Sequence, residues 1–201
     1  MAVIWCDTET TGLSPDDSGA FQVALLAVVV EDNGNKVVHE RMFMFNPLGG
    51  NVLYHASAGE IHGYSEDDIR ALPAEKEVIP NMVKFFNDIM TNYGKKPAEK
   101  MDFCGYNPKF DWGHLEQNLR RCGYNILDYF SGKLHDVQDQ AKLAVRKGVI
   151  GRLDNLKLTT VAKSLGVDME NAHDAMCDIK ATRKVSGIFA GKGVFFYLKS
   201  L

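Results

Sequence analysis

The chain has 201 residues, of which 45% are hydrophobic and 24% charged, with a formal net charge of −3. This composition is ordinary for a soluble globular protein, and the acidic balance argues against a generic nucleic-acid-binding domain, which is usually basic. The longest apolar run, Val23 to Val30, is too short to cross a bilayer, and the N-terminus lacks the basic and apolar regions of a signal peptide. We therefore expect a cytoplasmic protein that does not contact a membrane.

The first part of the chain is expected to form three strands. Residues 2–7 are mostly apolar and are followed by turn residues, and residues 22–31 form a long run rich in Val, Ala and Leu. Asp32-Asn33-Gly34-Asn35 is a hairpin signal. Residues 36–46 then alternate as an antiparallel partner strand.

The remainder of the chain mixes one short strand with helices. Residues 101–105 read as a buried strand, and Ser65 with Asp68 forms a capping-box pattern that begins a short helix. Apolar spacing and terminal glycines predict longer helices. These helices cover residues 76–93, 109–122, 134–147, 156–165 and 174–190. The order of elements indicates an α/β protein with a mixed sheet, and the length is compatible with a single domain over residues 1–201.

Four cysteines occur, and none belongs to a C-x-x-C pair. We expect reduced, mostly buried thiols in a reducing compartment, because zinc sites built on thiolates usually have short paired spacings. The cysteines are Cys6, Cys104, Cys122 and Cys177.

Basic residues gather in two segments despite the acidic net charge. Residues 141–163 contain six basic residues and one acidic residue, and residues 179–201 contain five basic residues and no acidic ones. Ordinary solvated helix faces are the simpler explanation of either segment alone. The alternative is that these segments follow the phosphates of a nucleic-acid strand, in which case added salt weakens binding.

The segment CDTETTGLSP, residues 6–15, places two carboxylates at the end of the first predicted strand. Residues two apart on a strand point the same way, so Asp7 and Glu9 are expected to face one side together. Two like charges held this close are unfavourable unless a cation lies between them, and carboxylates are natural ligands of Mg²⁺ and Mn²⁺. Taken alone, the D-x-E pattern is at least as compatible with a polar turn.

A second candidate carboxylate, Asp111, lies in GYNPKFDWGHLEQNL, residues 105–119. The predicted strand runs through Asn107-Pro108 into a helix, which puts Asp111 in the first helical turn. Open α/β sheets place ligand sites at the carboxyl ends of their strands, although a simple interaction with the helix dipole explains Asp111 alone. Gly113 is a poor helix former, and we expect it to loosen this helix.

The third segment is NAHDAMCDIKAT, residues 171–182. His173 and Asp178 are five residues apart, which is about 140° of rotation on a regular helix, so they do not share a helix face. Both can reach one site if His173 precedes the helix and Asn171 or Asp174 caps it. An exposed histidine and a solvated aspartate are the simpler explanation of each residue alone.

Together the three segments resemble the DEDDh, or DnaQ-like and RNase T-like, 3′→5′ exonucleases of the ribonuclease H-like fold, including proofreading exonucleases. DTETTGL resembles the first motif of that family, NPKFD its N-x-x-F-D motif, and HDAMCD its H-x-A-x-x-D motif. IHGYS at 61–65 and LDNLKLTTVAKSLGV at 153–167 are similar to its His-Gly turn and Asn-Leu-x-Leu helix. The sister branch carries Tyr four residues before the last Asp, where this chain has Asp174. The resemblance covers nearly the whole chain and implies a five-stranded mixed sheet flanked by helices.

The resemblance also implies a two-metal phosphodiesterase site. Asp7 would bridge two Mg²⁺ or Mn²⁺ ions, Glu9 and Asp178 would complete the metal that holds the attacking water, and Asp111 would serve the second metal through water. Two such ions about 3.5–4 Å apart can stabilise the attacking and leaving oxygens of an in-line displacement. His173 would act as the general base, since its reference pKa of about 6.5 suits proton removal near neutral pH.

The residues expected to contact the terminal nucleotide lie beside two of these motifs. As in the family, the backbone of Thr10 to Leu13, including Gly12, and the Leu13 side chain are expected to contact it. Phe110 and Trp112 flank Asp111 and can stack on a base, although core packing is the simpler explanation of both aromatic residues.

We therefore expect a metal-dependent 3′→5′ exonuclease that releases nucleoside monophosphates from single-stranded or frayed DNA ends. One alternative is an RNA-trimming exoribonuclease of the same family, because the catalytic residues do not distinguish DNA from RNA. Another is a non-catalytic module that binds nucleic acid or a polymerase. If the chain resembles the epsilon subunit of DNA polymerase III in function, its polymerase partner is expected to be a separate chain.

Overall fold

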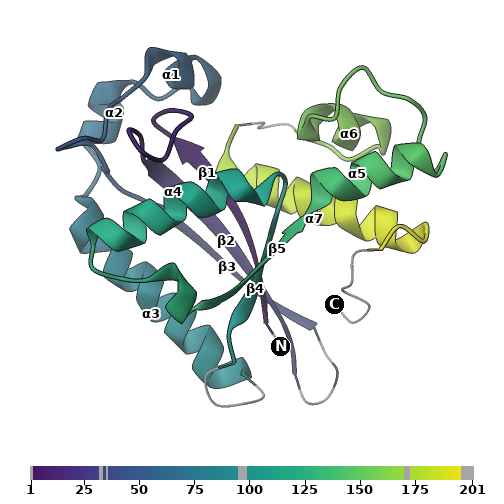
Figure 1. Cartoon of the computed structure of the whole chain (residues 1–201), viewed down its shortest axis with the longest axis horizontal. Helices are drawn as coiled ribbons and strands as arrows, with labels where there is room; N and C mark the ends of the chain where they lie inside the picture. Colours follow the sequence, from purple (N-terminus) through teal and green to yellow (C-terminus); the bar gives the residue numbers. More distant parts are fainter. Residues whose placement is uncertain (1, 32–33, 35, 95–98, 170–172, 196–201) are drawn as a thin grey trace.

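A five-stranded mixed sheet forms the centre of the protein. The computed structural model describes residues 2–31, 34, 36–94, 99–169 and 173–195, and its strand order is β3-β2-β1-β4-β5 (Figure 1). β1 pairs antiparallel with β2 and parallel with β4, and so lies in the middle of the sheet. The strands are β1 (Val3–Thr10), β2 (Ala20–Val30), β3 (Lys36–Met44), β4 (Met101–Gly105) and β5 (Phe130–Asp136).

Helices cover both faces of the sheet (Figure 1). α3 and α4 contribute to the core on one face, and α5, α6 and α7 contribute to the core on the other. The helices are α1 (Ala56–His62), α2 (Glu66–Arg70), α3 (Glu75–Tyr93), α4 (Pro108–Arg121), α5 (Val137–Arg146), α6 (Leu158–Ser164) and α7 (Ala175–Gly191), with a short 3₁₀ turn, η1 (Ile126–Asp128).

The alternation of β1 decides which layer each of its residues meets. Ile4 and Cys6 belong to the core under α3 and α4, whereas Val3 and Trp5 belong to the core under α7. All eleven residues of β2 are buried except the last, Val30, as suits a central strand covered on both faces. The sheet is therefore held by apolar packing from both sides up to the end of β1.

The four strands located from the sequence are confirmed, with ends that shift by up to three residues. Residues 32, 33 and 35 of the expected hairpin lie outside the described residues, and Gly34 has a φ of 83°. The strands on either side pair antiparallel as expected, with Val30 opposite Lys36. The capping box of Ser65 and Asp68 is also present.

The helix expected over residues 134–147 is wrong at its beginning. Residues 134–136 belong to β5, which pairs in parallel with β4, and α5 begins only at Val137. β5 is an edge strand that local sequence patterns did not predict; Leu134 pairs with Phe103 and His135 with Cys104. A usable signal was present, since the Asp136 side chain caps α5 by accepting a hydrogen bond from the Gln138 N–H.

Three smaller differences concern helices. α4 continues regularly through Gly113, contrary to the expected loosening, and a Cβ added there would lie 3.3 Å from Pro15 Cγ. The glycine therefore admits close packing of the loop that follows β1. α7 ends at Gly191 rather than before it, and α1 was not predicted.

The cysteines are free thiols, with Cys6 and Cys104 buried. Within the described residues, no helix combines the length and apolar character needed to cross a membrane.

Candidate active site

Two carboxylates project from the end of β1 toward α7. Asp7 and Glu9 lie on the same side of the strand as Val3 and Trp5, which pack under α7, so the expected common direction is confirmed by register. Glu9 is only 8% exposed. Thr8 lies between them and points to the opposite face.

Asp111 reaches the site from that opposite face. It lies in the first turn of α4 and is 3% exposed, and its Oδ1 accepts a 2.8 Å hydrogen bond from the Thr8 hydroxyl. Asn107, the residue just before α4, has a φ of 58°, and its N–H donates to Asp136 at the start of α5. The turn between β4 and α4 is thus fixed, and Asp111 is held against β1.

Asp178 and His173 come from the beginning of α7. Asp174 is the N-cap and accepts from the Cys177 N–H, while the alternative cap, Asn171, lies outside the described residues. His173 precedes the helix with a φ of 73°, and its backbone N–H lies 3.4 Å from Asp178 Oδ2. This left-handed residue bends the chain, so His173 and Asp178 reach one site although they are five residues apart.

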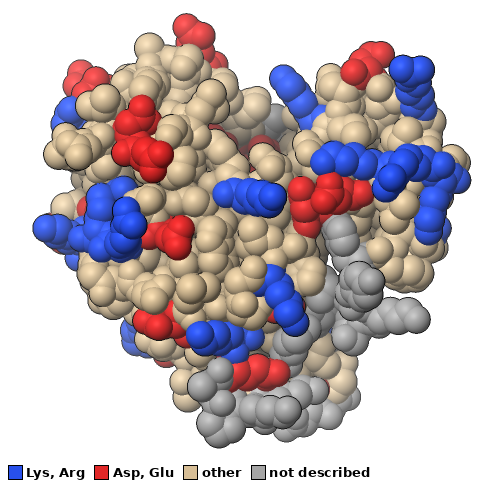
Figure 2. Space-filling model, viewed as in Figure 1, with Lys and Arg blue, Asp and Glu red and all other residues tan. Residues whose placement is uncertain are grey.

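These side chains form one cluster. Glu9, His173 and Asp178 each offer a ligand atom within 4.8 Å of the others. Asp7 lies close enough to Asp111, Asp178 and Glu9 that all three carboxylates raise its pKa. Figure 2 shows a hollow at the top of the molecule, between the part that carries α1 and α2 and the part that carries α6, with acidic atoms inside it.

Burial and mutual repulsion keep protons on these carboxyls. Burial is the largest cause for each of them, and it raises the pKa of Glu9 to about 8 and that of Asp111 to about 7. Asp178 adds to the effect on Glu9, whereas the hydrogen bond from Thr8 lowers the pKa of Asp111. The pKa of Asp7 and that of Asp178 are also raised by burial. Without a positive charge, the cluster is unfavourable in its ionised form.

The donor set suits a hard divalent cation. Four carboxylates converge, and Asp178 Oδ1 is buried with no hydrogen-bond partner among the described residues. An acceptor oxygen left without a donor is costly in a protein interior, and a cation is the partner that carboxylate oxygens accept best. The residues therefore fit Mg²⁺ or Mn²⁺.

The loop after β1 is held firmly over the same end of the sheet. The Thr10 hydroxyl donates to the Gly12 carbonyl at 2.8 Å, and a Cβ on Gly12 would lie 2.4 Å from His55 Cδ2, so a larger residue would have to displace the His55 ring. The Leu13 side chain is 82% exposed. A large apolar side chain presented to solvent by a fixed loop is available for contact with a ligand.

The two aromatic residues beside Asp111 have different surroundings. Trp112 packs edge-on against Phe103 and Phe130 in the core under α4, which agrees with core packing. Phe110 is half-buried, with its ring 4.5 Å from that of His114. Both side chains are partly buried, and the ring contacts of Trp112 with the core leave Phe110 as the better candidate for stacking on a base.

His62 is a polar residue near the site to which sequence reasoning assigned no role. Its ring packs edge-on against Phe21. Burial lowers its pKa, an effect that the nearby Thr10 backbone opposes and the charge of His173 reinforces. The IHGYS segment was the available signal, and Gly63 ends α1 with a φ of 81°.

The second basic segment does not surround the carboxylates. Lys180, Arg183 and Lys184 line a separate groove of about 620 Å³ along α7, whose floor includes Trp5 and Leu26. Lys180 pairs with Glu40 at 2.6 Å.

The fold and the site define a class of protein: an α/β domain with a ribonuclease H-like sheet and a cluster of carboxylates that suits divalent cations. Residues 4–186 match the family model RNase_T, described as Exonuclease. The chain therefore belongs to this exonuclease family of the DEDD type, and the resemblance drawn from the three motifs is confirmed.

Relatives and solved structures agree with this family. A DNA polymerase III PolC-type protein of Clostridium perfringens is 26% identical over 179 residues, which is 89% of this chain and 10% of that protein. The PolC-type protein of Oceanobacillus iheyensis is 24% identical over 180 residues, covering 88% of this chain and 10% of that protein. This chain spans about a tenth of the length of both.

Solved structures of E. coli exonuclease I share the fold. A zinc-bound complex of that enzyme with single-stranded DNA superposes with a TM-score of 0.77 at 22% identity, covering 98% of this chain and 42% of the other. A complex of the same enzyme with a dT13 oligonucleotide gives a TM-score of 0.72 at 22% identity, covering 95% and 41%. The expected five-stranded mixed sheet flanked by helices is confirmed by these neighbours.

The raised pKa of Glu9 predicts a pH-dependent stability. Since the folded protein holds this proton up to about pH 8 and the ordinary pKa is 4.5, the stabilisation is complete below the ordinary pKa and is lost as pH rises through the folded-state value. In EDTA, we expect the Tm of the wild type to fall relative to that of Glu9→Gln between about pH 5 and about pH 8. Circular dichroism measures both transitions.

Glu60→Gln is the matched control, because Glu60 is an exposed glutamate on α1. Its Tm should follow that of the wild type at every pH. A difference in Tm between wild type and Glu9→Gln that stays constant from about pH 5 to about pH 8 would contradict the raised pKa of Glu9.

Proposed function

We propose that this chain is a metal-dependent 3′→5′ exonuclease that releases nucleoside monophosphates from single-stranded or frayed DNA ends. The observation that carries the proposal is the convergence of Glu9, His173 and Asp178 within 4.8 Å, beside Asp7 and with Asp111 reaching β1 from the other face. Phosphodiester hydrolysis needs positive charge near the attacking and leaving oxygens, and a carboxylate cluster acquires it by binding divalent cations.

Asp7, Glu9, Asp111 and Asp178 are the proposed metal ligands. Bound Mg²⁺ or Mn²⁺ ions would supply the charge that stabilises the displacement at phosphorus, and we propose two ions. Asp7 suits the shared position because the charges of the other three carboxylates all act on it. The Thr8 hydroxyl orients Asp111 through its 2.8 Å hydrogen bond.

His173 is the proposed general base. Its side chain is exposed, and it lies beside Glu9 and Asp178, where a ring nitrogen can take a proton from an attacking water. Its left-handed backbone, anchored on Asp178, fixes the place from which the ring acts.

A basic surface lies to one side of the hollow. Figure 2 shows lysine and arginine side chains gathered over the part of the molecule formed by α5 and α6. We propose that these cations hold the phosphates of the strand behind its 3′ end, and that affinity therefore falls with added salt. The exposed basic residues of this region are Lys142, Arg146, Lys147, Arg152, Lys157 and Lys163.

The terminal nucleotide is proposed to contact Thr10, Gly12, Leu13 and Phe110. The exposed Leu13 side chain and the half-buried Phe110 ring offer apolar surface for a sugar or base. The DNA-bound neighbours support DNA as the substrate, while RNA 3′ ends stay an alternative because none of these contacts reads a 2′-OH.

The wider setting of the activity is also part of the proposal. The similarity to PolC-type polymerases supports an association with a DNA polymerase. In those relatives the similar segment is about a tenth of one long chain. Two further statements stay predictions from the sequence. One is that residues 1–201 form a single exonuclease domain, and the other is that the protein is cytoplasmic.

The direct test is a cleavage assay on a single-stranded DNA oligonucleotide labelled at its 5′ end, with an RNA of the same sequence beside it. In Mg²⁺ or Mn²⁺ we expect a ladder that shortens from the 3′ end, and EDTA should abolish it. Comparing the cleavage rates of the DNA and the RNA gives the sugar preference of the enzyme. Absence of cleavage with either metal would favour the binding-module alternative.

The role of His173 predicts a specific kinetic defect. His173→Ala should lower kcat by about 10²- to 10⁴-fold, the usual contribution of a general base, while the Mg²⁺ concentration that gives half-maximal rate stays unchanged. Single-turnover cleavage at several Mg²⁺ concentrations measures both. His39→Ala is the control, because His39 bonds Tyr93 on the other helical layer. A wild-type rate in His173→Ala would remove this residue from the mechanism.

A further inference from the structure

One face of α4 carries polar residues at intervals of three and four, which is an unusual pattern for a helix face turned toward a sheet. Asp111, His114, Asn118 and Arg121 lie along this face, and the first three are buried. Asp111 serves the carboxylate cluster. The other three, which we call the α4 polar stripe, have no place in the chemistry described above.

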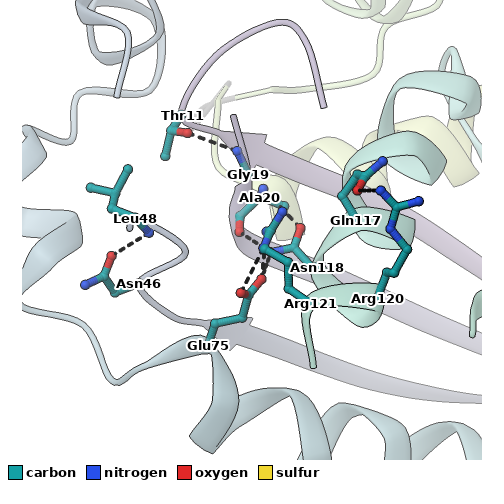
Figure 3. A network of polar contacts seen from close by, with 10 residues as sticks. All are labelled: Thr11, Gly19, Ala20, Asn46, Leu48, Glu75, Gln117, Asn118, Arg120 and Arg121. Carbon is teal, nitrogen blue, oxygen red and sulfur yellow. Dashed lines mark hydrogen bonds and ion pairs between the residues drawn. The ribbon is translucent and has the colours of Figure 1, made fainter. Parts of the chain in front are cut away.

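The α4 polar stripe binds the loop that follows β1. His114 Nε2 lies 3.1 Å from the Ser18 hydroxyl. The Asn118 side chain accepts from the Ala20 N–H at 3.2 Å and donates to the Ala20 carbonyl at 3.0 Å. Both polar groups of one backbone residue are therefore held by a single amide side chain (Figure 3).

Ala20 needs this support because the ladder is irregular there. Glu9 lies opposite Gln22 but Thr10 lies opposite Ala20, so Phe21 is an extra residue in β2. A bulge interrupts the ladder and bends the strand, which leaves backbone groups for a side chain to satisfy. The Asn118 amide does so at the point where the loop returns to the sheet.

Glu75 holds the stripe in place from α3. Its carboxylate accepts from the Asn118 amide, and from Arg121 Nε at 3.0 Å and Nη2 at 2.8 Å, a two-pronged ion pair (Figure 3). Arg121 Nη2 also lies against Gly19, where a Cβ would be 3.1 Å away. Such paired, partly buried hydrogen bonds fix geometry more firmly than a single exposed ion pair.

Fixing Gly19 also fixes the beginning of the loop. The Thr11 N–H donates to the Gly19 carbonyl at 2.9 Å, and the Thr11 hydroxyl accepts from the Gly19 N–H at 3.0 Å. Gly12 and Leu13 follow Thr11 directly. Hydrogen bonds thus join Arg121 through Glu75 and Asn118 to Ala20, and others join its neighbour Gly19 to Thr11, two residues before the exposed Leu13.

We propose that Asn118 and Arg121, with Glu75, are positioning residues that set the place of the nucleotide-contacting segment, Thr10 to Leu13, relative to Asp111 and the carboxylate cluster. One rigid helix carries Asp111 at its beginning and the loop-binding residues further along, so loop and cluster keep one spacing. This inference rests on the proposed exonuclease function for its effect on substrate, while the hold on the loop stands on the contacts alone.

The test compares two arginine variants on the same helix turn. Arg121→Gln removes the ion pair to Glu75, whereas Arg120→Gln removes an equal charge from a side chain that bonds only to Gln117 among the contacts drawn (Figure 3). We expect Arg121→Gln to raise the KM for a single-stranded oligonucleotide about tenfold with kcat nearly unchanged, because it weakens binding shared by ground and transition states. Arg120→Gln should change neither, and Arg121→Lys should recover part of the loss.

Hydrogen exchange measured without metal gives a second readout. Amides of residues 11–19 should exchange faster in Arg121→Gln than in Arg120→Gln, while amides in the middle of β2 stay protected. If Arg121→Gln did not fold, Glu75→Gln would test the same ion pair with little change in volume.

Failure of the inference and failure of the proposed function give different results. A wild-type chain without nuclease activity would refute the function, and exchange would still decide whether the stripe holds the loop. Unchanged exchange in residues 11–19, or a lower kcat at unchanged KM, would overturn the positioning role.

Discussion

The repulsion among four carboxyls at the end of β1 is the constraint on which the rest of the site depends. Asp7, Glu9, Asp111 and Asp178 are gathered from a strand and two helices, and burial raises the pKa of each. The charges of the other carboxylates raise the pKa of Asp7 and that of Glu9 further. Folding places these groups together because apolar packing on both faces of β1 stabilises the sheet. We propose that bound cations offset the cost of bringing these carboxyls together, because positive charge removes the repulsion between them.

The two helical layers bring different site residues to β1. The layer of α7 brings Asp178 and His173 to one face of β1, and the layer of α4 brings Asp111 to the other. The Thr8 hydroxyl joins the second layer to the strand. α4 then extends the same control to the loop after β1, because its polar stripe and Glu75 hold the residues where that loop returns. The proposed metal ligand Asp111 and the proposed nucleotide contacts thus share one rigid support.

Local sequence patterns predicted the features that depend on a few neighbouring residues. The period of two in β1 placed Asp7 and Glu9 on one side, and the turn before α4 placed Asp111. A helix start capped by Asn171 or Asp174 allowed His173 and Asp178 to reach one site, and the structure shows Asp174 as the cap. Resemblance to a family then joined these segments into one site. The number of strands also came from that resemblance, since local patterns located only four.

Features made by distant pairing were beyond such patterns. β5 is an edge strand whose residues 134–136 resemble the start of a helix, and only its parallel partner β4 fixes them in a sheet. The roles of Asn118 and Arg121 depend on a bulge in β2 and on Glu75, more than forty residues away in the chain, and the role of His114 depends on Ser18. In the sequence these residues look like the solvent-exposed face of a helix. Polar side chains are found both on faces turned to solvent and on faces that bind a buried loop, so the pattern does not distinguish the two.

The most direct test of the account is calorimetric titration of Mn²⁺ into the protein near neutral pH. The account predicts two ions per chain, with protons released as the carboxyls with raised pKa ionise, and loss of this binding in Asp7→Asn. Binding of no ion, or unchanged binding in Asp7→Asn, would contradict the claim that the end of β1 is built to hold metal.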